Sequence, residues 1–583
     1  MKKRKLYIIQ SKSQASHYFR KFSKEENTVL ALSVGAMSFL ESRKIKYITT
    51  NYFIPMKEEA KQKIYIENKF FNFFDLLDKE LVKISSKLNH TAYCLRFHYT
   101  HSICLLHYAN QLAKSIIDSD FDTIYFYKRK TLIKYIYKFR LHPTNTMTTV
   151  LLSFKDKKNI KLLSMMPNCQ EAFEDLNHFL RSKIWPYLRP FVKRNINNKT
   201  TKRYQKGYKP FYLMLGGEYE WPRFVANQNS IEAERIVINQ FIFPLKNSLR
   251  KKIKATFVKL IAKEFYLDAL LVSRFLKPLI DESVADLVNI INRFDEFNKL
   301  IEKYTGIITS VVSDPIDVYL CLLFINNKKP VYLWQHGSGG TETDNLLSDY
   351  CELLVCSTFL SYSEAVSRGY KKQLTVYSSD FKSPNFISVG SVHKKSVKQT
   401  LVNSRLVTLA SGKYWGIPRL LWPNEDPDIR LFNIQKTFIK IAHDYKKNYQ
   451  FMIKANNTSH HNRLPFESNS FIDIEYRKSF TEVLLNSSVI VLDTPATTLL
   501  EASNTNLPIF AILGRAEYTA EFLDVSAKRI CWCKDYSDFS IKLRQYLDTG
   551  YYPADMFNQD FRDMYLGPET QKEVWRKVER ILK

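Results

Sequence analysis

The sequence has 583 residues, more than a single hydrophobic core usually serves, so two or three domains are expected. Hydrophobic residues make up 45% and aromatic residues 14%, which excludes a disordered protein. The 87 Lys and Arg against 58 Asp and Glu leave a net charge of +29, which predicts attraction to a polyanion or an anionic membrane surface.

Strand-like and helix-like runs alternate along the chain, as is typical of parallel sheets covered by helices. The run "KLYIIQ" (5–10) predicts a first buried strand, and residues 27–50 predict a helix followed by a strand at 46–49. Long helical patterns then dominate residues 55–300, with one weak strand candidate at 122–128. We therefore expect a helical insertion in the N-terminal domain.

The pattern becomes more regular after residue 305, where two series of short apolar runs each end in small or polar residues. The first series covers 306–314, 330–336, 353–357 and 386–391, and the second covers 405–411, 450–456, 471–475, 489–494 and 507–513. The predicted fold class is α/β, with two Rossmann-like domains in tandem. The expected limits are 1–395 for the N-terminal domain, 396–565 for the C-terminal domain and 566–583 for a final amphipathic helix.

Cysteines and apolar runs exclude several classes of protein. The 8 cysteines are scattered and form neither a disulfide framework nor a paired CxxC zinc site, so we expect reduced thiols in a cytoplasmic protein. No run approaches the roughly 18–20 apolar residues that a membrane span needs. Any work at a membrane would therefore be peripheral.

Two segments concentrate the positive charge. Residues 193–209 hold seven Lys or Arg and no acid, and residues 245–263 alternate basic and apolar residues at helical spacing. Both are expected either to bind anionic lipid or to form an ordinary solvated loop and helix face.

Candidate ligand-binding residues follow from the strand ends. In an open parallel sheet the ligand binds outside the carboxyl ends of the strands, where loops and helix N-termini converge. This rule selects Asp314, His336, Ser357, Ser391, Ser411 with Gly412, Lys454, and Asp493 with Thr494.

The strongest candidate is "VIVLDTPATTLLEASNTNLPIFAI" (489–512), in which a buried strand runs into a polar turn and a helix. Thr494, Thr497 and Thr498 are expected to cap that helix and to leave its N-terminal N–H groups facing an anion such as a nucleotide phosphate. Glu501, one to two turns into the helix, is expected to reach a ribose hydroxyl. An ordinary capped helix without a ligand explains the same residues.

The same segment resembles the nucleotide-binding element of the C-terminal domain in GT-B glycosyltransferases, through Asp493, Thr494, Thr497, Thr498 and Glu501. The stretch "QHGSGG" (335–340) resembles the His-Gly turn of bacterial surface-polymer transferases. These include the CDP-glycerol (teichoic acid) polymerases and the Kdo transferases of capsule and lipopolysaccharide. Residues 30–53 resemble the opening helix and strand of the same group.

This resemblance implies transfer from a nucleotide-sugar donor without a metal or other cofactor. One departure is that such enzymes often follow the lysine of the second domain closely with a His-Pro pair. Here Lys454 is followed, after a longer polar spacer, by His460 and His461 without proline. Lys454 is therefore preferred as the phosphate ligand, and the two histidines are equally explained as loop residues.

Sugar transfer requires a base for the acceptor hydroxyl or groups that offset charge on the leaving phosphate. His336 fits either role because a histidine titrates near neutral pH, although a structural role is equally well supported. Asp314 and Glu218 are the rival bases. The chain has no P-loop, no Gly-x-Gly-x-x-Gly after the first strand, no Gly-x-Ser-x-Gly elbow and no His-Glu-x-x-His, which removes the kinase, dehydrogenase, hydrolase and metalloprotease classes.

The resulting hypothesis is a glycosyltransferase that moves a sugar, taken to be Kdo from CMP-Kdo, to a surface polysaccharide or lipid-linked acceptor. It would act in the cytoplasm, peripheral to the inner membrane, without binding nucleic acid. The first alternative is a CDP-polyol phosphotransferase of the teichoic acid type. The second is a non-catalytic, basic RNA-binding protein, which segments such as 135–147, with interleaved aromatic and basic residues, would favour.

Overall fold

A computed structural model describes most of the chain. The described residues are 4–23, 25–129, 150–154, 156, 158–165, 210–215, 220–226, 230–235, 247–312, 314–337, 353–374, 383–392, 405–412, 414, 428–455, 464–514 and 518–583.

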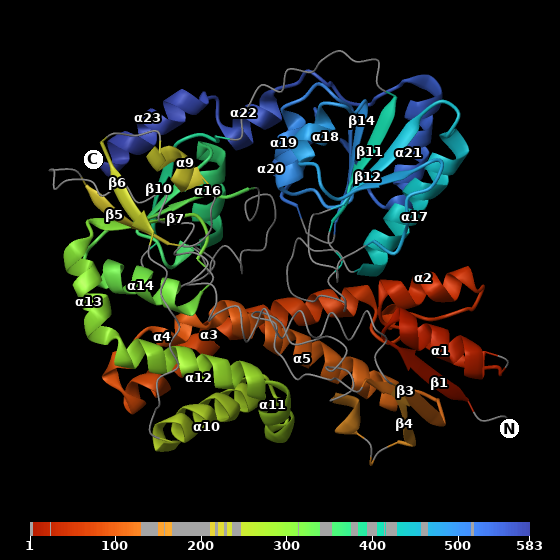
Figure 1. The fold of residues 1–583 in the computed structure, drawn as a ribbon, viewed down its shortest axis with the longest axis horizontal. Helices are drawn as coiled ribbons and strands as arrows, with labels where there is room; N and C mark the ends of the chain where they lie inside the picture. Colours follow the sequence, from red (N-terminus) through yellow and green to blue (C-terminus); the bar gives the residue numbers. More distant parts are fainter. Residues whose placement is uncertain are drawn as a thin grey trace.

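Three parallel β-sheets organise these residues (Figure 1). We name them the N-terminal sheet, of four strands in the order β2-β1-β3-β4, the central sheet, of six strands in the order β10-β9-β8-β7-β5-β6, and the C-terminal sheet, of six strands in the order β13-β12-β11-β14-β15-β16. The central and C-terminal sheets confirm the predicted α/β class with two Rossmann-like domains. The N-terminal sheet is an addition to that prediction.

The N-terminal sheet is built from the first strands of the chain and from two strands that return after residue 120. Its strands are β1 (Lys5–Ile9), β2 (Thr28–Ala31), β3 (Thr123–Arg129) and β4 (Ile160–Met165). In β1, Leu6 and Ile8 pack into one hydrophobic cluster while Tyr7 and Ile9 pack into another, so the sheet is buried on both faces. Helices α1 (Lys12–Phe22) and α2 (Val34–Ser42) cover one of these faces.

The prediction of a strand at 46–49 is wrong. Only Ile48 pairs there, as an isolated bridge to Leu30, and the second strand is instead β2. The short apolar run 29–32, which covers most of β2, fits a strand and a helix equally well. Periodicity alone therefore did not separate β2 from the helix that follows it.

The central sheet has the strand order of flavodoxin-like α/β folds, and its switch point lies between β5 and β7. Its strands are β5 (Phe211–Met214), β6 (Glu232–Arg235), β7 (Gly306–Thr309), β8 (Val331–Trp334), β9 (Thr358–Ser361) and β10 (Asn385–Ser388). Its helices are α9 (Glu220–Ala226), α14 (Pro315–Asn326) and α16 (Glu364–Leu374). The strand expected at 353–357 is displaced and begins at Thr358.

The C-terminal sheet has the strand order of dinucleotide-binding folds, with its switch point between β11 and β14. Its strands are β11 (Leu406–Ala410), β12 (Gln450–Lys454), β13 (Asp473–Glu475), β14 (Val489–Leu492), β15 (Ile509–Ile512) and β16 (Cys531–Cys533). Its helices are α17 (Asp428–Tyr445), α18 (Phe480–Leu484), α19 (Thr497–Ser503), α20 (Ala520–Ala527) and α21 (Tyr536–Thr549).

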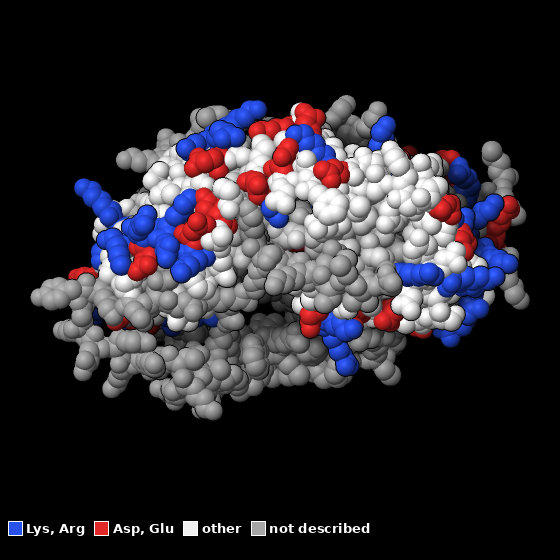
Figure 2. All heavy atoms as spheres, turned by 90° about the horizontal axis from the view of Figure 1, so that it is seen from above, with Lys and Arg blue, Asp and Glu red and all other residues white. Residues whose placement is uncertain are grey.

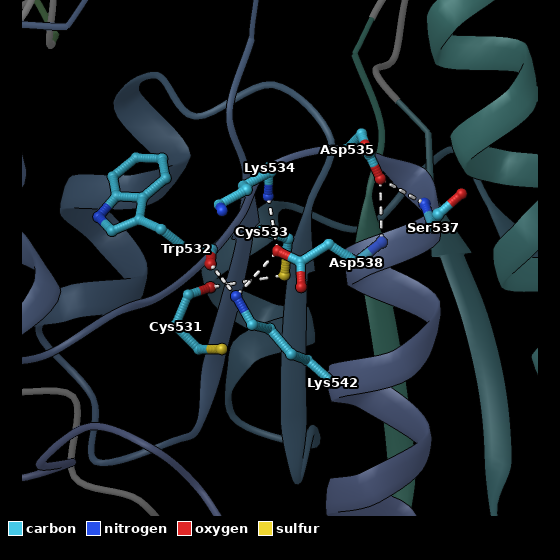
Figure 3. Close-up of polar contacts among 8 residues, drawn as sticks. All are labelled: Cys531, Trp532, Cys533, Lys534, Asp535, Ser537, Asp538 and Lys542. Carbon is cyan, nitrogen blue, oxygen red and sulfur yellow. Dashed lines mark hydrogen bonds and ion pairs between the residues drawn. The ribbon is translucent and has the colours of Figure 1, made fainter.

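The edge strand β16 carries two of the free, buried cysteines, Cys531 and Cys533 (Figure 3). Lys542 of α21 fixes this edge, because its ammonium donates to the Trp532 carbonyl and to the Asp538 carboxylate, each at 2.8 Å. The expectation of reduced, buried thiols is met at these two positions.

Helices account for much of the described part of residues 55–300, although β3 to β6 lie in the same stretch, and the helical insertion itself stays a prediction. The helices are α3 (Met56–Ile84), α4 (Thr91–Cys94), α5 (Arg96–Ile117), α10 (Asn247–Glu264), α11 (Ala269–Phe275), α12 (Lys277–Asn292) and α13 (Phe294–Lys303). Short 3₁₀ turns lie at Thr50–Tyr52 and Ser86–Leu88. Helices α3 and α5 run below the two Rossmann-like sheets in Figure 1.

The last two helices, α22 (Asp560–Leu566) and α23 (Gln571–Leu582), bring the chain from the C-terminal sheet back to the central sheet (Figure 1). The Tyr212 hydroxyl of β5 donates to the Leu582 carbonyl at 2.7 Å, and the Ser391 N–H donates to the Leu566 carbonyl at 2.9 Å. The expected amphipathic helix at 566–583 is therefore α23, packed on the other Rossmann-like unit. The domain limits at 395 and 565 stay predictions.

Candidate functional site

The switch point of the C-terminal sheet is held by one buried carboxylate. Asp493, which follows β14, is fully buried and accepts hydrogen bonds from the Gly412 N–H at 2.6 Å and from Gln435 Nε2 at 3.0 Å. Gln435 also donates to Ser411 Oγ at 2.8 Å and accepts a hydrogen bond from the Tyr414 hydroxyl. The turns after β11 and β14 are thus locked together at the point where this fold type binds ligands.

Gly412 is required by the closeness of these two turns. A Cβ atom on Gly412 would lie 2.3 Å from Thr494 Oγ1. Thr494 Oγ1 itself is buried and has no hydrogen-bond partner among the described residues. Gly412 and Thr494, which are both expected to bind the donor, therefore lie side by side, and within the described part of the chain the Thr494 hydroxyl is unused.

The threonines expected to cap the following helix do not do so. The N-cap of α19 is Ala496, which has no side-chain oxygen, so no N-cap side chain bonds the first N–H groups. Thr497 and Thr498 are instead the first two residues inside the helix. The capping prediction is wrong, but its consequence for an anion becomes stronger, because no N-cap side chain occupies the N-terminal N–H groups of α19.

Glu501 lies one turn into α19 and beside α18. Its carboxylate accepts a hydrogen bond of 3.4 Å from Thr481 Oγ1, and burial raises its pKa. A carboxyl group that tends toward its neutral form can donate a hydrogen bond as well as accept one.

Lys454 ends β12, the strand next to β11. Its side chain is 8% exposed, its ammonium donates to the Ala455 carbonyl at 2.6 Å, and burial lowers its pKa while Glu475 opposes that effect. The Ser411 N–H donates to the Lys454 carbonyl at 3.0 Å, which places the lysine one strand from the switch point. A buried cation whose described partners are one carbonyl and the charge of Glu475 is suited to an anionic ligand.

In the central sheet, β8 runs into Gln335, His336 and Gly337. The Gln335 side chain accepts from the Tyr362 N–H at 2.8 Å and donates to the Gly337 carbonyl at 3.1 Å, while the Gly337 N–H donates to the Tyr362 hydroxyl at 3.0 Å. Gly337 has a φ of +73°, a conformation that favours glycine. The turn that carries His336 is thereby rigidly held.

Burial lowers the pKa of His336 to about 4, and a hydrogen bond with the backbone of Ser310 opposes this effect. The imidazole is therefore neutral near pH 7, so it can accept a proton. A permanently charged histidine would not have this capacity.

The two Rossmann-like units meet at this turn. A Cβ atom on Gly337 would lie 2.3 Å from Oγ1 of Thr497, the first residue of α19. The His336 turn of the central sheet thus touches the N-terminus of α19 in the C-terminal sheet. The structure brings together sequence candidates from both domains, across a separation of 160 residues between Gly337 and Thr497.

The two rival bases are placed differently. Asp314 is the N-cap of α14, and its carboxylate accepts a hydrogen bond from the Ile316 N–H at 3.1 Å, which gives it a structural role. Glu218 lies outside the described residues, as do His460 and His461.

Four side chains that organise the site were missed by the sequence analysis: Gln335, Tyr362, Tyr414 and Gln435. The signal for Gln435 was a polar residue on the buried face of α17, where it is fully buried. The other three have no local signal, because their partners lie far away in sequence.

Two further observations concern the described residues alone. None of their helices has both the length and the apolar character needed to cross a membrane. They also contain no group of three or more His, Cys, Asp or Glu that could hold a metal ion, and metal independence stays a prediction.

No protein-family model and no curated protein matches the chain. Among solved structures, HepE of Anabaena in complex with UDP is 9% identical, with a TM-score of 0.35 over 64% of this chain and 99% of its own. The UDP-N-acetylglucosamine 2-epimerase of Rickettsia bellii is 11% identical, with a TM-score of 0.36 over 64% and 96%. TarM is 11% identical, with a TM-score of 0.30, and the match spans 48% of this chain and 54% of TarM. Similarity this weak assigns neither a family nor an activity to the chain.

Proposed function

We propose that the protein is a glycosyltransferase that moves a sugar from a nucleotide donor to an acceptor between its two Rossmann-like units. The observation that carries this proposal is the contact between the His336–Gly337 turn and the first residue of α19 at Thr497. A donor bound at the switch point of the C-terminal sheet would have a neutral histidine of the central sheet beside it.

The donor phosphates would bind the N–H groups at the start of α19, which have no N-cap side chain, the hydroxyl of Thr494 and the ammonium of Lys454. Thr497 and Thr498 supply further hydroxyls at the same place. Glu501 would bind a ribose hydroxyl, and Ser411 and Gly412 would form the wall of the site beside Asp493.

His336 would take the proton of the acceptor hydroxyl as that oxygen attacks the sugar. Its low pKa keeps the ring neutral near pH 7, and also makes it a weaker base than an unperturbed histidine. Glu218 stays a rival base because it comes four residues after Met214, the end of β5, in the sequence. Asp314 is the weaker rival, since capping α14 accounts for it.

Within this proposal, the donor is CMP-Kdo and the acceptor is a surface polysaccharide or a lipid-linked precursor at the inner face of a bacterial membrane. A CDP-polyol phosphotransferase of the teichoic acid type would use the same phosphate site and differ in the group transferred. Both readings need a cytidine nucleotide at the C-terminal sheet.

The experiment is thermal unfolding with CMP, CMP-Kdo, CDP-glycerol and UDP-sugars, because a ligand at 100 times its Kd stabilises the native state by about 2.7 kcal/mol. We expect stabilisation by CMP and CMP-Kdo, loss of that effect in Lys454→Gln, and no loss in the control Lys447→Gln, whose side chain is exposed after α17. Stabilisation by CDP-glycerol alone would support the phosphotransferase. No response to any nucleotide would overturn both readings.

A further inference from the structure

Helix α10 presents a stripe of lysines to solvent. Its exposed residues recur every three or four positions and therefore share one face; they are Ser248, Lys251, Lys252, Ala255, Lys259 and Lys263. None of these six is acidic, although Lys263 pairs with the neighbouring Glu264 at 3.8 Å. The opposite face packs into the core through Ile253, Phe257 and Ile261, all fully buried.

The stripe ends at an apolar projection between α10 and α11. Tyr266 is 76% exposed and Leu270 is 56% exposed, which is unusual for side chains of this size. Tyr266 has a φ of +50°, so this aromatic residue is held in a strained backbone conformation. Such a conformation persists only where the surrounding structure imposes it.

A cation fixes the aromatic ring of Tyr266. The ammonium of Lys69 on α3 lies 3.8 Å from the centre of the Tyr266 ring and 4.7 Å from that of Tyr65, and it donates to the Glu264 carbonyl at 2.9 Å. Tyr65 is itself 49% exposed. The projection is therefore an ordered platform of two tyrosines and a leucine, bordered by lysines.

The charge on the face over α22 and α23 is arranged differently. In Figure 2, which views the molecule from above, Lys and Arg lie next to Asp and Glu there. Ion pairs such as Lys528–Asp560 and Lys577–Glu569 pair these charges. Helices α10 and α11 lie at the opposite, lower edge of the molecule in Figure 1.

We propose that the α10–α11 edge docks on a lipid bilayer with anionic headgroups. The lysine stripe would contact the headgroups, while Tyr266 and Leu270 would insert at the interface, where amphipathic rings and alkyl-lysine stems are favoured. A soluble polyanion offers no apolar layer for Leu270, so the platform favours a membrane over RNA. This inference deepens the proposed function and rests on its acceptor being at a membrane.

The test is co-sedimentation of the full chain with two kinds of vesicle. One kind is phosphatidylcholine alone, and the other contains phosphatidylglycerol as about one third of the lipid. We expect binding only to the anionic vesicles and release at high salt. Lys251→Gln with Lys252→Gln should weaken binding by about 30-fold, at about fivefold for each charge near the surface. Tyr266→Ser with Leu270→Ser should weaken binding and leave its salt dependence unchanged.

Two control variants match these changes on the C-terminal unit. Lys446→Gln with Lys447→Gln removes an adjacent exposed lysine pair, and Ile541→Ser with Phe557→Ser removes side chains that are 67% and 65% exposed. Neither control should alter vesicle binding. Equal effects of controls and α10–α11 variants, or binding of single-stranded RNA without binding of vesicles, would overturn the inference. Because no nucleotide is present, this result is independent of the donor assay, which is run without vesicles.

Discussion

Replacing Gly337 by alanine tests whether the two Rossmann-like units touch at the candidate site. The left-handed backbone at a φ of +73° costs a residue with a Cβ about 1–2 kcal/mol. The added atom would also lie 2.3 Å from Thr497 Oγ1, so the turn or α19 must shift, at about 1–3 kcal/mol for an overpacked contact. The sum of about 2–5 kcal/mol predicts a fall in the melting temperature of at least about 4 °C and weaker nucleotide stabilisation.

The second half of this test is a double-mutant cycle measured by thermal unfolding. Thr497→Ala removes the clashing oxygen and leaves Cβ at 3.5 Å from the added atom, an ordinary contact, so it should restore part of the loss in the Gly337→Ala background. Thr497→Val keeps a γ-atom of similar size and should not restore it. Equal rescue by alanine and valine, or no effect of Gly337→Ala at all, would refute the contact between the units.

Three further predictions concern buried groups. The pKa of His336 is about 4 in the folded chain and 6.5 when unperturbed, so the stability contributed by the neutral imidazole is present above pH 6.5 and is lost as the pH falls toward 4, by about 3 kcal/mol. When the pH is lowered from 7.5 to 5, the free energy of unfolding should fall less in His336→Gln than in the parent chain. Identical pH profiles would contradict the burial of the ring. Asp493→Asn should lower the melting temperature, because a charged hydrogen bond to Gly412 or Gln435 contributes about 1.5–3 kcal/mol; an unchanged value would mean that the carboxylate does not lock the turns. Arg96 is 4% exposed, and both of its terminal nitrogens lack a hydrogen-bond partner among the described residues. Arg96→Met should therefore show an equal or higher midpoint of thermal unfolding. A large fall in the midpoint would reveal an anionic partner.

The sequence predicts the positions of the site better than its contacts. The rule that ligands bind at strand ends selected His336, Lys454 and Thr494, because a buried strand followed by a polar turn is visible in a short window. It also selected Asp314, whose role in the structure is to cap α14. Strand-end position is a property of the local sequence, whereas a side chain's partner is not.

Three results depend on distant residues and therefore could not be predicted. The pairing of β1 with β3 joins strands more than 100 residues apart and creates the N-terminal sheet. The need for glycine at 337 arises from Thr497, and the need for glycine at 412 arises from Thr494. A short window shows such a glycine but not the atom that excludes its Cβ.

The return of α23 to the central sheet constrains how the protein is made. Val574 and Val578 are fully buried and Leu582 is 2% exposed, in the same hydrophobic cluster as the central strands. Strand β5 leaves the ribosome more than 350 residues before Leu582, whose carbonyl its Tyr212 hydroxyl bonds. During synthesis the apolar surface of the central unit therefore stays uncovered until the whole C-terminal unit has emerged. Chaperones would be expected to bind that surface in the meantime.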